Sequence, residues 1–124
     1  MEYISNYKDI PLIAVQYITN DYYWYQYGNL IVVLDIRTQY INATQMCKLI
    51  SRINGTNDII AWLQRQIQLL AELSQYVMRP VESLVKYQAG MPDVINGLYV
   101  HPIIVPYIIA WASHVEKSDD IIPR

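Results

Sequence analysis

The chain has 124 residues, of which 53% are hydrophobic and 16% are charged. This length and composition are typical of one domain that buries a core without disulfide support, and they argue against a disordered chain. The formal net charge of -2 means that the chain as a whole does not indicate nucleic-acid binding. A single cysteine excludes an internal disulfide and, with only two histidines, argues against a structural zinc site.

Signatures of membrane insertion and of catalysis are absent from the sequence. No apolar run reaches the roughly 18 residues of a membrane span, and the N-terminal segment lacks the pattern of a signal peptide, so we expect a cytosolic or nuclear protein. No G-x-S-x-G, Walker-type, H-E-x-x-H or paired C-x-x-C motif occurs. We therefore predict that the protein is not an enzyme and uses no cofactor, no metal and no small-molecule substrate.

The N-terminal third contains one clear hairpin signal. Residues 10–18 are compatible with a strand or with a short helix, and we predict only that they are ordered and packed. Residues 22–36 are rich in aromatic and β-branched residues on both sides of Gly28-Asn29, which predicts a β-hairpin. Tyr23 and Tyr25 alternate with Trp24, so tyrosines line one face. Such a ladder can stack nucleobases, but we expect it to pack in the core.

The first helix is expected to begin after Asn42. This residue can serve as an N-cap, with Gln45 three residues later in the position of a capping box. Four residues then recur with helical spacing on one apolar face: Ala43, Met46, Cys47 and Ile50. We expect Gln45, Lys48 and Arg52 to share the opposite face.

A second, longer helix should follow the turn at residues 54–57. Either Thr56 or Asp58 is expected to cap it, and Arg79-Pro80 to stop it after residue 78. Its predicted buried face consists of Ile59, Trp62, Leu63, Ile67 and Leu70. Its predicted exposed face consists of Asn57, Ala61, Gln64, Arg65 and Gln68. Because the two helices are joined by a short turn, they form a helix-turn-helix or an αα-hairpin, which spacing alone does not separate.

The C-terminal part predicts a second hairpin and a final helix. Residues 81–88 and 97–100 suit two strands joined by a loop with Gly90 and Pro92, which beside a helix-turn-helix resembles a wing. A helix should begin near residue 105. His101 can cap this helix or donate to a ligand, and we expect it to cap or to pack. Residues 116–124 are polar and are expected to fray.

The basic residues concentrate in the middle of the chain. Residues 37–92 carry six cations against three carboxylates, and they are the only basic part. The side chains of this part suit phosphate and base contacts, and they equally suit an ordinary solvated surface. The candidate DNA-binding residues are Lys48, Arg52, Asn57, Gln64, Arg65, Gln68, Arg79 and Lys86.

Four groups of residues occur in an order typical of one family. They are Tyr40-Ile41-Asn42-Ala43-Thr44 with Met46-Cys47, then Trp62-Leu63, then Gly97-Leu98-Tyr99-Val100-His101-Pro102, and finally Pro106-Tyr107-Ile108 with Ala110-Trp111. Over residues 22–115 the chain resembles the KilA-N domain of large DNA viruses and phages, and above all the poxvirus members of that family. The KilA-N domain is related to the fungal APSES DNA-binding domain.

This resemblance implies a winged-helix-like α+β domain with an N-terminal β-hairpin, a helix-turn-helix pair, a wing hairpin and a C-terminal helix. It also implies a non-enzymatic viral module that contacts duplex DNA through the helix pair and the wing, in the host cytoplasm or nucleus. We expect residues 1–21 to be an extension packed on the domain, residues 22–115 to be the domain, and residues 116–124 to be a polar tail.

The acidic total and the high apolar fraction support an alternative. In this alternative, the domain keeps the KilA-N fold, has lost DNA binding, and binds a second copy of itself or a host protein. The contact would be an apolar patch that includes Tyr23, Tyr25 or the C-terminal helix.

Overall fold

A computed structural model describes residues 3–5, 11–50 and 55–121, with the side chains of residues 16–50 and 55–114. One seven-stranded antiparallel sheet has the order β1-β2-β3-β4-β5-β7-β6. The strands are β1 (Tyr3–Ser5), β2 (Pro11–Thr19), β3 (Tyr22–Tyr27), β4 (Leu30–Asp35), β5 (Tyr40–Asn42), β6 (Val85–Gln88) and β7 (Gly97–Val100). The helices are α1 (Ala43–Ile50), α2 (Thr56–Gln64), α3 (Ile67–Val77) and α4 (Val105–Ile121), with short 3₁₀ turns η2 (Val81–Ser83), η3 (Asp93–Ile95) and η4 (Pro102–Ile104). The predicted α+β class is confirmed.

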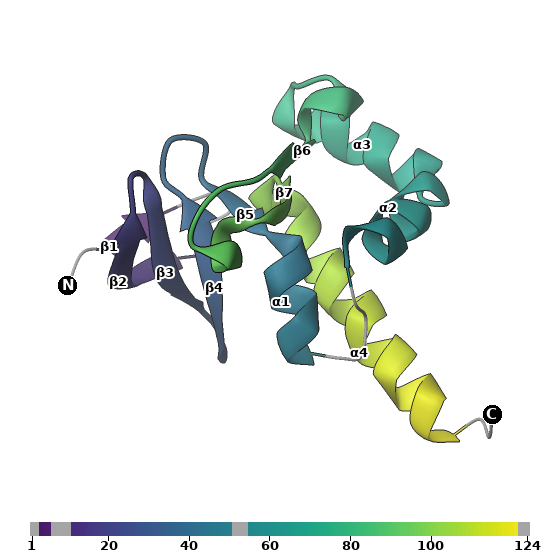
Figure 1. The fold of residues 1–124 in the computed structure, drawn as a ribbon. Helices are drawn as coiled ribbons and strands as arrows, with labels where there is room; N and C mark the ends of the chain where they lie inside the picture. Colours follow the sequence, from purple (N-terminus) through teal and green to yellow (C-terminus); the bar gives the residue numbers. More distant parts are fainter. Residues whose placement is uncertain (1–2, 6–10, 51–54, 122–124) are drawn as a thin grey trace.

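Strands β1 to β4 lie at one end of the molecule and the helices at the other (Figure 1). The hairpin of β3 and β4 turns at Gly28, whose φ of +58° suits glycine, as the sequence predicted. Residues 10–18, which were compatible with two structures, belong largely to strand β2, which pairs with β3.

Successive residues of the strands point to opposite faces, and each face has its own core. Val32 and Leu34 of β4 belong to the larger core under the helices, whereas Val33 belongs to a smaller cluster on the other face. Tyr25 is 1% exposed in the larger core, and Tyr23 packs against that core. The expectation that this tyrosine ladder packs rather than stacks bases is therefore confirmed for Tyr25.

Helix α1 begins as predicted. The side-chain oxygen of Asn42 accepts a hydrogen bond of 3.0 Å from the backbone N–H of Gln45. Ala43, Met46 and Cys47 are fully buried, and α1 packs against α4, β7 and β4.

The prediction of one long second helix is wrong. The chain forms α2 and α3, because the N–H groups of Arg65 and Gln66 bond to carbonyls three residues earlier and tighten the last turn of α2. Ile67, which was assigned to the buried face, begins α3 and is 75% exposed. The expected side-chain cap is also wrong, since Gly55 is the N-cap of α2 and forms no side-chain cap bond, while Thr56 is the first helical residue.

The C-terminal part differs from its prediction at two points. Residues 81–83 form a 3₁₀ turn, so the strand of the second hairpin begins only at Val85. Helix α4 begins at Val105 as expected but continues to Ile121, into the segment that was expected to fray. Strand β7 pairs with both β5 and β6, which makes the wing hairpin part of the main sheet.

Candidate nucleic-acid interface

Seven of the eight candidate residues have exposed side chains, and Arg52 lies outside the described residues. The exposed ones are Lys48, Asn57, Gln64, Arg65, Gln68, Arg79 and Lys86. Within the described side chains, none of the four cations among them forms an ion pair with a carboxylate. Their charges are therefore available to a ligand.

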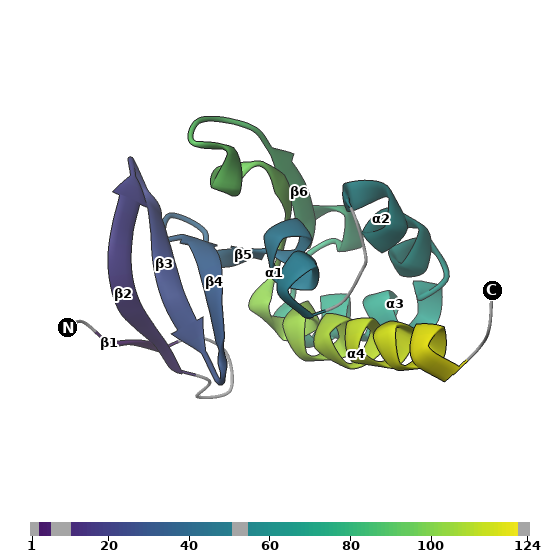
Figure 2. The ribbon, with the colours of Figure 1, turned by 60° about the horizontal axis from the view of Figure 1, so that its bottom comes forward.

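The structure does not gather these candidates at one point. Lys48 lies in the last turn of α1, and Arg65 lies at the C-cap of α2. In both ribbon views the end of α1 and the junction of α2 with α3 are well separated (Figures 1 and 2). Gln64 lines an apolar groove between α2, α3 and the sheet, together with Ile67 and Val81.

Arg79 and Lys86, by contrast, line one cleft of about 490 Å³. Arg37, from the turn between β4 and β5, lines it too. Arg79 follows the left-handed C-cap of α3, and its Nη1 donates to the hydroxyl of Tyr40 over 3.2 Å. That hydroxyl in turn donates to the carbonyl of Ser83 over 2.6 Å. Tyr40 thus holds the Arg79 guanidinium at the cleft.

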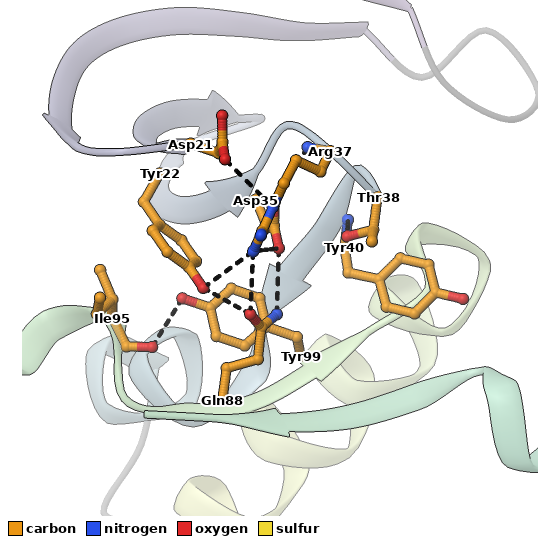
Figure 3. Close-up of polar contacts among 9 residues, drawn as sticks. All are labelled: Asp21, Tyr22, Asp35, Arg37, Thr38, Tyr40, Gln88, Ile95 and Tyr99. Carbon is orange, nitrogen blue, oxygen red and sulfur yellow. Dashed lines mark hydrogen bonds and ion pairs between the residues drawn. The ribbon is translucent and has the colours of Figure 1, made fainter. Parts of the chain in front are cut away.

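Arg37 is held by the carboxylate of Asp35, which is 1% exposed (Figure 3). Its Nε and Nη2 donate to the two carboxylate oxygens over 3.1 and 3.0 Å, and its backbone N–H adds a third bond. Burial alone would raise the pKa of Asp35, but these hydrogen bonds outweigh burial and lower it. Gln88 of β6 donates to the same carboxylate, so one polar network joins β4 to the wing hairpin.

Sequence reasoning missed Arg37 as a site residue. It was counted among the central cations, but an arginine in a short turn carries no helical spacing to place it on a surface. The signal that could have found it is the Asp35-Ile36-Arg37 spacing, because a carboxylate and a cation two residues apart can pair across a turn.

The wing is anchored to the start of α1 by Asn42. The Asn42 side chain is fully buried, and its Nδ2 donates to the carbonyls of Val94 and Asn96 over 3.1 and 3.0 Å. Gly97 has a φ of +150°, and a Cβ there would overlap the Asn42 Oδ1 and lie 2.8 Å from the Cβ of Thr44. Only glycine allows this close approach of the wing to α1.

His101 caps the 3₁₀ turn η4 that leads into α4, which agrees with the expected capping role. Its Nδ1 accepts a hydrogen bond of 3.0 Å from the N–H of Ile103, and its ring lies 5.5 Å from that of Tyr40. Burial, followed by the positive charge of Arg79, lowers the pKa of His101 to about 4. The imidazole is therefore neutral at pH 7.

Comparison with known proteins identifies the family. The family model of the KilA-N domain matches residues 25–122. The chain belongs to the KilA-N family. It is 30% identical over 104 residues to protein R878 of Acanthamoeba polyphaga mimivirus, which is named for a KilA-N domain. That alignment covers 82% of this chain and 29% of the mimivirus protein. It is 26% identical over 108 residues to fowlpox virus protein FPV248, covering 82% and 68%. No solved structure matches the chain significantly.

The KilA-N family is generally associated with DNA binding and is not typically enzymatic. This KilA-N chain spans about a quarter to a third of the length of the first mimivirus relatives. In the described part of the chain, no three His, Cys, Asp or Glu side chains are grouped so that they could hold a metal ion. None of the helices that the structure describes has the length and apolar character to cross a lipid bilayer.

Proposed function

We propose that this KilA-N domain binds duplex DNA through its surface cations, with phosphate contacts dominating. The observation that carries the proposal is that every described candidate cation is exposed and is not paired with a described carboxylate, in a domain whose family is associated with DNA. Phosphate contacts fix the register on the duplex, whereas base contacts specify sequence. Asn57, Gln64 and Gln68 carry exposed amides of the type that reads adenine edges.

The net charge of -2 sets the strength that we expect. The affinity for DNA should be modest, because a chain of negative net charge does not attract DNA over long range. The favourable electrostatic energy of binding then comes from a few local contacts between cations and phosphates. Each phosphate that is neutralised contributes about -0.9 to the slope of log affinity against log salt. Four contacts would therefore weaken binding by roughly 150-fold between 50 and 200 mM salt.

The test is a fluorescence-anisotropy titration with a mixed-sequence duplex at roughly 50 and 200 mM salt. We expect saturable binding at the lower concentration and a steep loss at the higher one. Arg65→Gln should weaken binding to all sequences alike and reduce the salt slope by about 0.9. Gln16→Glu on β2 is the matched control, because it makes the same change in net charge on an exposed strand far from the helices. No binding of the wild-type protein at the lower salt would contradict the proposal.

One observation supports the alternative of a protein-interaction module. An apolar groove is lined by Ile60, Leu63, Gln64, Ile67, Leu70, Ala71, Val81, Val85 and Leu98. Ile67 is 75% exposed at its edge. Tyr25, which the alternative placed in a contact patch, is in the core instead.

The alternative is tested by sedimentation across a wide concentration range. Self-association that Ile67→Lys abolishes, while DNA binding is unchanged, would support it. A monomer at every concentration would contradict self-association as the function of the groove.

A further inference from the structure

The cleft at Arg79 offers more than one exposed cation. Two adjoining hollows share Arg37, Thr38 and Arg79 as lining residues. They lie where the turn between β4 and β5 approaches the end of α3 and the start of β6. Lys86 is on the same face as the buried Tyr99, because these two residues are directly paired across β6 and β7. Val85, which also lines the cleft, points to the other face with Val100, so the cleft lies at the edge of the sheet that β6 forms.

We propose that Arg37 and Arg79, with Lys86 at the rim, hold one phosphodiester group of the DNA backbone. This inference rests on the proposed DNA-binding function and assigns a phosphate anchor outside the helix pair. Of these three residues, Arg79 and Lys86 were already candidates from the sequence, whereas Arg37 was not.

The donors of the cleft are already positioned. Arg79 is tied to Tyr40 through Nη1, and Arg37 is tied to Asp35 through Nε and Nη2. Each guanidinium has five N–H donors, so both have N–H groups left over. The Thr38 Oγ1 accepts from the N–H of Tyr40, which leaves its own hydroxyl hydrogen to be donated. Donors that are held in place before binding lose little conformational freedom when an oxyanion arrives.

The balance of charge favours a singly charged ligand. The charged residues that line the cleft are Arg37, Arg79, Lys86 and Glu82. The carboxylates of Asp35 and Asp21 lie 3.0 and 3.4 Å from guanidinium nitrogens of Arg37, and their two negative charges exceed its single positive charge by one. Arg79 and Lys86 against Glu82 add one positive charge, so the formal charges of these six residues sum to zero and only a ligand of low charge fits them. A phosphodiester carries one negative charge and suits this balance, whereas a nucleotide's terminal phosphates carry more.

The test compares two pairs of variants with the same duplex in the same titration. Arg79→Gln and Lys86→Gln should each weaken binding about tenfold at roughly 50 mM salt and lower the salt slope by about 0.9. Lys48→Gln removes the same charge from the end of α1 and should cost less. Glu82→Gln should strengthen binding about two- to threefold, because Glu82 is the carboxylate among the described residues that line the cleft.

Controls separate a binding effect from a folding effect. Urea midpoints are measured for all variants. Lys86→Gln is the decisive variant, because the Lys86 side chain is exposed and forms no described hydrogen bond or ion pair. Competition with ATP at constant ionic strength tests the source of the phosphate. Displacement of the duplex by low concentrations of ATP from the wild-type protein, but not from Arg79→Gln, would assign the cleft to a free nucleotide and overturn the phosphodiester proposal.

Failure of this inference is distinct from failure of the proposed function. If the wild-type protein binds duplex while Arg79→Gln and Lys86→Gln behave like the Gln16→Glu control, the phosphate anchor is wrong and DNA binding stands. If the wild-type protein does not bind at all, both proposals fall.

Discussion

Replacing Asn42 with alanine should be among the most damaging single changes in this domain. The side chain is fully buried and serves two partners at once, the first turn of α1 and the tip of the wing. Loss of an N-cap costs about 1 kcal/mol. Loss of the donor to two carbonyls costs about 1 to 1.5 kcal/mol each, because both lie where water has little access. The free energy of unfolding should fall by about 3 to 4 kcal/mol, against a typical total of roughly 5 to 15.

Two further variants separate the roles of this side chain. Asn42→Asp keeps the acceptor for the N–H of Gln45 but places a carboxylate oxygen beside the carbonyls of Val94 and Asn96, so it should be at least as damaging as alanine at pH 7. Gly97→Ala should also be severe, and less so in the Asn42→Ala background, because the overlap with Oδ1 is then relieved.

The assay is urea unfolding followed by tryptophan fluorescence, with Asn57→Ala as the control. Asn57 is exposed in the first turn of α2 and should change stability by less than about 0.5 kcal/mol. An Asn42→Ala protein within about 1 kcal/mol of wild type, or an Asn42→Asp protein as stable as wild type, would refute the argument that this residue clamps the wing.

Three other predictions follow from buried ionisable groups. His101 has a pKa of about 4 in the folded protein and about 6.5 in the unfolded chain, so the unfolded chain binds more protons between these two values. The free energy of unfolding should therefore fall by at most about 2 kcal/mol from pH 7 to pH 5, which urea midpoints at the two pH values will show. Cys47 is fully buried with its pKa raised to about 12 by burial, so it should react with Ellman's reagent only when the protein unfolds; rapid labelling of the native protein would contradict this. Asp35→Asn should lower the free energy of unfolding by about 3 kcal/mol in urea, because it leaves Arg37 and Gln88 without their carboxylate. Asp21→Asn, at the exposed end of the network, should lower it by less than about 1 kcal/mol. Equal costs would contradict the role of Asp35 as the buried centre of this network.

The elements that the sequence predicted well are those set by local chemistry. Gly28-Asn29 marks the first hairpin because only a few residues adopt positive φ, and Asn42 marks the start of α1 because its side chain bonds to a backbone group three residues away. Pro102 and Pro106 restrict where α4 can begin. None of these signals requires knowledge of a distant partner.

The break between α2 and α3 shows where local reasoning fails. Residues 59, 62, 63, 67 and 70 fit one helical period, and no glycine or proline interrupts them. The chain nevertheless turns at Arg65-Gln66, which exposes Ile67 and allows Leu73 and Val77 to be buried. Tertiary packing decided this, and it also separated Gln64 from Arg79 and Lys86, which the sequence had assigned to a common DNA-binding surface.

The residues that identify the family in this chain are chiefly those that hold it together. Asn42 joins α1 to the wing, Thr44 accepts a hydrogen bond from the N–H of Leu98, and His101 packs against Tyr40, which positions Arg79. None of these three motif residues is exposed. The exposed cations lie outside the family motifs, on helix ends, an edge strand and turns, where substitution has little effect on the fold. The fold and the affinity for DNA can therefore vary independently in such a domain. Arg65→Gln and Lys86→Gln should change the salt slope while leaving the urea midpoint in place, because neither side chain is among the described contacts that hold the fold. Substitutions at Asn42 or Gly97 should do the reverse at temperatures where the domain remains folded.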